Sequence, residues 1–238
     1  MITSRHQKWA DRLFGIYLNR LFRRHFYTIR LLDPVPDLNN EKPVLVLPNH
    51  STWWDGFFFY YLNKYRLHRR IYLMMLESQL RRNRFFRFLG AYSVHTGSYT
   101  GVRKSLEYTL SLLNRPQEPA AVCVFPQGEL QPWHVRPVTF RRGLAFILKN
   151  IHTEIELCFL GIRVEYRGEQ RPDVYLQMSH AATMIPGASF SLSGLQSGFN
   201  EFLDTLEKRI TRGDTGTVIF RGKKSVDDRY SGKRNRGE

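Results

Sequence analysis

Between residues 44 and 178 the chain alternates short apolar runs with longer amphipathic stretches. The apolar runs are bounded by polar residues and rich in branched and aromatic side chains, which is typical of buried strands. The predicted strands are Val44–Leu47, Ile71–Leu76, Ala91–Val94, Ala120–Phe125, Ile155–Ile162 and Val174–Met178. The predicted helices are Asp55–Tyr65, Ser78–Leu89, Val102–Leu113, Phe140–Asn150 and Gly194–Ile210. The alternation predicts an α/β domain with a mostly parallel central sheet flanked by helices.

The N-terminal segment has a helical pattern instead. One face of a helical wheel holds Phe14, Tyr17, Leu18, Leu21, Phe22 and His25. The other face holds Arg12, Asn19, Arg20 and Arg23, with Ile16 as an apolar exception. Such an amphipathic helix suits a membrane interface, and it equally suits packing on its own domain. We predict a basic amphipathic helical segment over residues 1–32, a central domain over 33–220 and a basic, polar, disordered tail over 221–238.

Composition and charge exclude several classes of protein. The chain has 238 residues, of which 42% are hydrophobic and 14% aromatic, so it is not a disordered chain. Two cysteines are too few for a disulfide scaffold, and Cys123 and Cys158 lie in apolar runs that predict buried strand positions. No run approaches 18 apolar residues, and the N-terminus lacks a signal-peptide pattern.

The charge is strongly positive. There are 36 Lys+Arg against 21 Asp+Glu, a formal net charge of +15 and a pI near 10.1. This balance suits either nucleic acid or an anionic membrane with acidic substrates. Basic residues cluster at 66–70 and again at 81–88, where phenylalanines interleave with them, and this pattern fits lipid head groups, an acidic carrier protein or single-stranded nucleic acid. The absence of a zinc-finger, helix-turn-helix or RNA-binding sheet pattern argues against nucleic acid.

One candidate for catalysis follows the first predicted strand. His50 and Asp55 stand five residues apart where that strand gives way to a helix, the edge at which open α/β sheets place ligands. A carboxylate on one imidazole nitrogen fixes the tautomer, so that the other nitrogen can accept a proton from a hydroxyl. The sequence has no G-x-S-x-G elbow for a covalent nucleophile. A His used in this way activates the hydroxyl of the acceptor itself.

The segment around this pair resembles a known family. Pro48–Gly56, PNHSTWWDG, resembles the N-H-x4-D block of the glycerolipid acyltransferases, which include the bacterial PlsC-type 1-acylglycerol-3-phosphate acyltransferases. Further segments resemble later blocks of the family in the same order. They are Leu89–Val94, Val124–Gly128, Phe140–Ala145 and Leu157–Arg163. The resemblance extends roughly from Val44 to Tyr166.

The resemblance implies a membrane-associated O-acyltransferase of phospholipid biosynthesis. His50 is expected as the general base and Asp55 as the residue that orients it. Acyl-CoA or acyl carrier protein is expected as the donor, a lysophospholipid as the acceptor, and no bound cofactor or metal. The expected substrate-binding residues are Asn49, Gly90, Phe125, Pro126, Gln127, Gly128, Glu129, Arg103, Arg141 and Arg142. The expected location is the cytoplasmic face of the cell membrane, as a peripheral or monotopic protein at its anionic surface.

The chain departs from the family where phosphate is expected to bind. The F-P-E-G-T-R block is replaced by Phe-Pro-Gln-Gly-Glu-Leu, and the arginine of the second block falls at Thr96. Neither Thr nor Leu can replace a guanidinium group that grips a phosphate. Other arginines in these blocks are candidates to take over, namely Arg103, Arg136, Arg141 and Arg142. Otherwise the acceptor lacks a phosphomonoester, as a glycolipid or carotenoid glycoside does. A non-catalytic lipid-binding protein and a basic nucleic-acid-binding protein are the alternatives of another class.

Overall fold

The computed structural model describes residues 1–115 and 120–223. The α-helices are α1 (Lys8–His25), α2 (Asp55–Leu62), α3 (Glu77–Arg82), α4 (Tyr99–Leu113), α5 (Gly143–Lys149) and α6 (Leu192–Thr211). A π-helix, η1 (Asn63–Leu67), follows α2, and a 3-10 helix, η2 (Arg84–Leu89), follows α3. The strands are β1 (Thr28–Leu31), β2 (Val44–Pro48), β3 (Arg70–Leu76), β4 (Ala91–Val94), β5 (Ala120–Cys123), β6 (Ile155–Glu165), β7 (Asp173–Met178), β8 (Ala182–Met184) and β9 (Thr217–Arg221).

The strands form one sheet in the order β4-β3-β5-β2-β6-β7-β1-β9, and β8 pairs with β6 outside this path. Strands β2 to β6 pair with one another in parallel, as do β1 and β7. The pairs β6–β7, β6–β8 and β1–β9 are antiparallel. The predicted fold class, a mostly parallel sheet flanked by helices, is confirmed.

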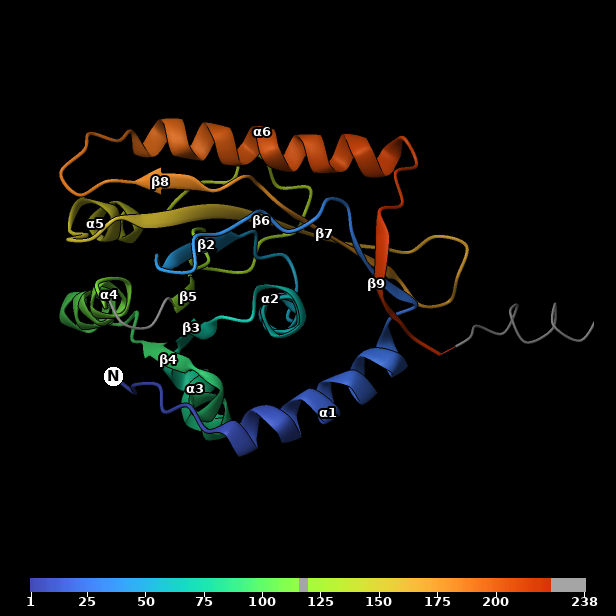
Figure 1. Cartoon of the computed structure of the whole chain (residues 1–238), viewed down its shortest axis with the longest axis horizontal. Coiled ribbons are helices and arrows are strands. Elements are labelled where there is room, and N and C mark those ends of the chain that lie inside the picture. The colour runs from blue at the N-terminus through green and yellow to red at the C-terminus, as the bar shows by residue number, and fades with distance from the viewer. Residues whose placement is uncertain (116–119, 224–238) are drawn as a thin grey trace, which may run out of the picture.

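Helices cover both faces of the sheet, with α6 on one side and α1 on the other (Figure 1). Successive side chains of a strand point to opposite faces. In β2, Val44 and Val46 pack into the core under α1 and α2, whereas Leu45 and Leu47 pack into the core under α4, α5 and α6. The strand is therefore buried on both sides, as the continuous apolar run predicts.

The helix α1 is part of this core. Its buried residues Phe14, Leu18 and Phe22 are spaced by four, so they share the face that packs on α2 and η2. The predicted helical segment over residues 1–32 is corrected, because the helix ends at His25 and Thr28–Leu31 is strand β1. Backbone pairing with both β7 and β9 holds these residues in the sheet.

Other boundaries also differ from those predicted. The helix predicted over Ser78–Leu89 breaks at Asn83, whose backbone (φ −120°, ψ 58°) is not helical. The strand predicted to reach Phe125 ends at Cys123. Of the predicted tail, Arg221 belongs to β9, and the prediction for residues 224–238 lies outside the described residues.

Both cysteines lie in strands, as predicted, with free and buried thiols. Burial raises the pKa of the Cys158 thiol to about 12 and that of the Cys123 thiol well above its ordinary value. Both thiols are therefore protonated at neutral pH, which is typical of structural cysteines. Among the described residues, none of the helices combines the length and apolar character that crossing a membrane requires.

Candidate active site

His50 lies just beyond the carboxyl end of β2. Its Nδ1 is 2.9 Å from Oδ2 of Asp55, the first residue of α2. Since an ionised carboxylate can only accept, Nδ1 carries the hydrogen and Nε2 is left with its lone pair. No described residue bonds to Nε2, and the His50 side chain is 22% exposed. The pair therefore has the geometry of a general base with its orienting acid.

The Asp55 carboxylate is fully buried and held by a dense set of donors. Its Oδ2 accepts from the backbone N–H groups of Ser51 (2.7 Å) and Thr52 (2.8 Å). Its Oδ1 accepts from the Thr52 hydroxyl at 2.6 Å. These bonds stabilise the charged form in a buried position, where an unbonded carboxylate is unfavourable. The carboxylate also raises the pKa of Cys123, as a second cause after burial.

The loop after β5 fixes His50 from the other side. The Phe125 ring stacks on the imidazole with 4.0 Å between centroids and 23° between planes. The His50 N–H donates to Oε1 of buried Gln127 at 2.6 Å, and the His50 carbonyl accepts from the backbone N–H of Gln131 at 2.9 Å. Gly128 turns this loop with φ +71°, in the left-handed region that favours glycine. Residues 125–130, the block that departs from the family pattern, thus still contact His50.

His50 opens into a cavity of about 890 Å³ between α1, α2, the α3–η2 segment and the ends of β3 and β4. Most of its wall is apolar, from residues such as Phe14, Phe57, Leu73 and Phe86. The ionisable groups of the wall besides His50 and two tyrosines are Arg82, Arg84 and Glu129. This volume falls in the range of small-ligand sites, and its mostly apolar wall suits a hydrocarbon chain.

The structure brings Phe125, Gly128 and Glu129 into this wall together with His50, as predicted. Gln127 lies behind His50 rather than in the wall. Asn49 is buried, and its side chain donates to Ile162 O (3.0 Å) and Ser51 Oγ (3.1 Å) and accepts from Ile162 N (2.7 Å).

Gly90 and Pro126 also lie outside the wall. Gly90 has φ +103°, and a Cβ there would be 2.1 Å from the Ile71 carbonyl oxygen. The backbone conformation and the close Ile71 carbonyl therefore explain why a glycine stands at this position.

The three arginines predicted to bind substrate are not part of the cavity wall. Arg103 lies on α4, on the other face of the sheet, and pairs with Glu107. Arg141 donates to Gln127 O at 3.1 Å and to Glu129 Oε1 at 2.9 Å, and Arg142 is exposed at the start of α5. The arginines that do line the wall, Arg82 and Arg84, belong to the basic cluster at 81–88, whose position near His50 only the fold determines.

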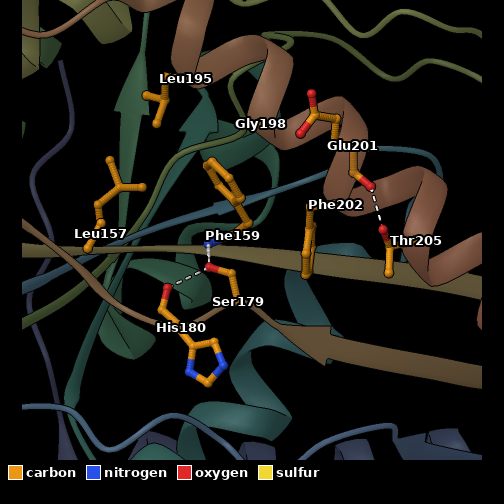
Figure 2. A pocket seen from close by; sticks show the side chains of 10 residues that line it. Leu157, Phe159, Ser179, His180, Leu195, Gly198, Glu201, Phe202 and Thr205 are labelled. Atoms are coloured by element: carbon orange, nitrogen blue, oxygen red, sulfur yellow. Dashed lines mark hydrogen bonds between the residues drawn. The ribbon is translucent and has the colours of Figure 1, made fainter.

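A second hollow of about 410 Å³ lies on the opposite face, under α6 (Figure 2). Phe159 and Phe202 line it. Its polar groups bond locally, because Ser179 Oγ accepts from Phe159 N and donates to His180 O, both at 2.9 Å. Thr205 Oγ1 donates to Glu201 O within α6. The hollow holds no pair comparable to His50 and Asp55.

A His–Asp pair at the carboxyl end of a parallel sheet, beside a mostly apolar cavity, is the arrangement of an α/β enzyme with a candidate general base. The model of the family described as Acyltransferase matches residues 26–159, and the chain belongs to this family. The protein is therefore an acyltransferase, and the resemblance of its sequence blocks to the glycerolipid acyltransferases is confirmed.

A solved structure agrees on the fold. The crystal structure of the 1-acyl-sn-glycerophosphate (LPA) acyltransferase, PlsC, from Thermotoga maritima matches with a TM-score of 0.59. The two sequences are 14% identical, and the match covers 86% of this chain and 80% of that chain. Comparison with curated proteins gives no significant match.

Proposed function

We propose that the protein transfers a fatty acyl chain from an acyl thioester to a hydroxyl of a membrane lipid acceptor, by default a lysophospholipid such as 1-acylglycerol-3-phosphate. One observation carries the proposal. His50 borders a mostly apolar cavity and bonds to a buried carboxylate through Nδ1, which leaves Nε2 for the acceptor. Acyl-CoA and acyl carrier protein are the two donor classes that present such a thioester.

The chemistry needs no covalent acyl-enzyme. Nε2 of His50 takes the proton of the acceptor hydroxyl while its oxygen attacks the thioester carbonyl carbon. The tetrahedral intermediate carries the negative charge on the former carbonyl oxygen. It collapses with cleavage of the C–S bond, and the imidazolium returns the proton to the departing thiolate. Asp55 stabilises the imidazolium throughout, since its carboxylate stays 2.9 Å from Nδ1.

The exposed side of α1 supports a location at a membrane surface. Trp9, Leu13, Ile16 and Tyr17 are each 50–57% exposed and fall on one arc of the helix, opposite the packed face. Arginines 12, 20, 23 and 24 are exposed on the same arc. Aromatic and aliphatic groups threaded with arginines suit the interface of an anionic membrane.

The cavity opens beside this arc. Leu13 and Tyr17 belong both to the arc and to the cavity wall, and exposed Trp53 and Leu130 also line the wall. An acceptor anchored in the membrane by its acyl chain therefore has an apolar path to His50. We propose that the protein binds the membrane peripherally. One face of α1 then packs on the domain, and the opposite face contacts the membrane.

The experiment that tests this function is product analysis after incubation with palmitoyl-CoA and a mixed lipid extract. His50→Ala is expected to lower the rate by at least about 10²–10⁴-fold, the contribution of a positioned general base. His152→Ala is the matched control, because that side chain is exposed in the turn before β6. Equal rates for His50→Ala and wild type, or lipid binding by wild type without any acyl transfer, contradict the proposal.

A further inference from the structure

Two arginines at the α3–η2 turn border the cavity and have no partner among the described residues. Arg82 and Arg84 line the same cavity as His50, and both side chains are exposed. Within residues 1–115 and 120–223 neither guanidinium group has a hydrogen bond or an ion pair. Arg81, one residue earlier, instead donates to Glu77 Oε1 from Nε at 3.0 Å and from Nη2 at 2.6 Å. The two wall arginines are therefore free to bind a ligand.

The break at Asn83 is what brings them together. In a continuous helix residues 82 and 84 would be about 200° apart and face opposite sides. Because Asn83 leaves the helical conformation and η2 begins at Arg84, both side chains border one cavity. Gln79 and Asn83 border it as well and add amide groups to the same end. The turn thus forms a polar, positively charged end on an otherwise apolar wall.

The opposite lip of the cavity lacks such a group. Leu130 is half exposed there, and Glu129 beside it is paired with Arg141 at 2.9 Å on the outside. Thr96 is exposed and does not line the cavity. β5 alone separates β3, which leads into α3, from β2, which leads to His50, so the two strand ends are about 10 Å apart. The turn follows β3 after the six-residue helix α3, about 9 Å long, and it borders the same cavity as His50.

We propose that Arg82 and Arg84 bind a phosphate ester of the substrate, so that the phosphate site lies on the α3–η2 turn. The planar guanidinium fork suits phosphate oxygens, and two arginines on one turn can share one phosphate. This inference rests on the proposed acyl transfer, because both concern the same cavity. The phosphate belongs either to the acceptor head group or to the coenzyme A part of the donor.

The test compares Arg82→Gln/Arg84→Gln with Arg81→Gln/Arg103→Gln, which removes the same charge from exposed positions outside the cavity. Palmitoyl-pantetheine, which lacks phosphate, is the donor, and lysophosphatidic acid or monoacylglycerol is the acceptor. A loss of about 10–100-fold per arginine in kcat/KM is expected for lysophosphatidic acid alone. Arg84→Lys is expected to retain part of the activity, because an ammonium group keeps the charge without the fork.

A second arm uses palmitoyl-CoA. A loss seen only with this donor, whichever acceptor is present, still supports a phosphate site and assigns it to coenzyme A. Equal kcat/KM for the double variant and its control in both arms overturns the inference.

Ligand affinity separates this inference from the proposed function. Trp53 lines the cavity, so its fluorescence reports binding of lysophosphatidic acid or coenzyme A to protein that need not turn over. If wild type transfers no acyl group, a binding loss confined to Arg82→Gln/Arg84→Gln still supports the phosphate site. Unchanged binding in that variant contradicts it.

Discussion

The two ends of the cavity are built differently. At the catalytic end, every polar atom of His50 except Nε2 is bonded, through Asp55, Gln127 and Gln131. At the α3–η2 end, Arg82 and Arg84 are exposed and have no partner among the described residues. With the phosphate site that we propose, the reactive geometry is held by hydrogen bonds within the protein, while recognition is left to side chains that the substrate orders. The predictions below test this contrast.

The largest effect is expected from Asp55→Asn. Its amide oxygen can take the place of Oδ2, and its NH2 group can donate to the Thr52 hydroxyl that now donates to Oδ1. The fold is thus retained, but the charge that stabilises the imidazolium is lost. We expect kcat to fall about 10³–10⁴-fold with KM nearly unchanged, similar to loss of the orienting carboxylate in Ser–His–Asp triads. Steady-state kinetics and a thermal melt measure both parts.

The control is Glu107→Gln, which removes an exposed carboxylate from α4 on the other face. It is expected to change kcat by less than about twofold. A comparable kcat for Asp55→Asn and wild type would show that the bonds to Asp55 serve the loop alone.

This catalytic end was predictable because its parts are close in the sequence. The segment from His50 to Asp55 is six residues long and also contains Ser51 and Thr52, whose N–H groups donate to Asp55. The strand before it is buried on both faces and therefore appears in the sequence as a continuous apolar run. The predicted strand differs from β2 only by Pro48. Local spacing and the topology of parallel sheets therefore suffice to place the pair.

The recognition end was not predictable, since it depends on one backbone break. The helical pattern over 78–89 gives no signal for the change at Asn83, and without it Arg82 and Arg84 point to opposite sides. The strands β1, β8 and β9 were also missed, because polar or charged residues interrupt them and no continuous apolar run marks them in the sequence. Asn49 was expected to bind substrate, and only the register with Ile162 shows its structural use.

The second prediction concerns the membrane side of the cavity mouth. Trp9→Ser/Ile16→Ser removes two half-exposed apolar side chains of α1 that do not line the cavity. Sedimentation with anionic vesicles is expected to show about 10–100-fold weaker partitioning, because part of each side chain leaves the bilayer interface. Because Trp9 also packs on Phe85 and Phe88, the free energy of unfolding is expected to fall by about 1–2 kcal/mol, which leaves the fold intact and is measured separately by denaturation.

Tyr166→Ser/Ile185→Ser is the matched control, since it removes an exposed aromatic and an exposed aliphatic residue elsewhere. It is expected to leave partitioning unchanged. Equal partitioning of the two double variants would contradict the assignment of α1 to the membrane surface. It would leave the catalytic end unaffected.

The third prediction concerns Gln127, a positioning residue. Gln127→Leu leaves the partly buried His50 N–H without its acceptor, so we expect kcat to fall about tenfold. Gln127→Glu restores an acceptor oxygen, and we expect it to recover most of that loss. Recovery by Glu but not by Leu distinguishes the hydrogen bond from simple packing, and an unchanged KM for the acceptor separates positioning from substrate contact.

The smallest effect is expected from Leu130→Arg, which places a guanidinium on the lip where the family would have one. Because Arg82 and Arg84 already provide the cationic end, we expect kcat/KM for lysophosphatidic acid to rise less than about threefold. In the Arg82→Gln/Arg84→Gln background the same substitution should recover about tenfold, since a cation again borders the cavity. Equal gains in both backgrounds would mean that the two lips bind different groups. Whether the gain from Leu130→Arg differs between wild type and the double variant therefore tests directly whether the two lips provide alternative positions for one phosphate site.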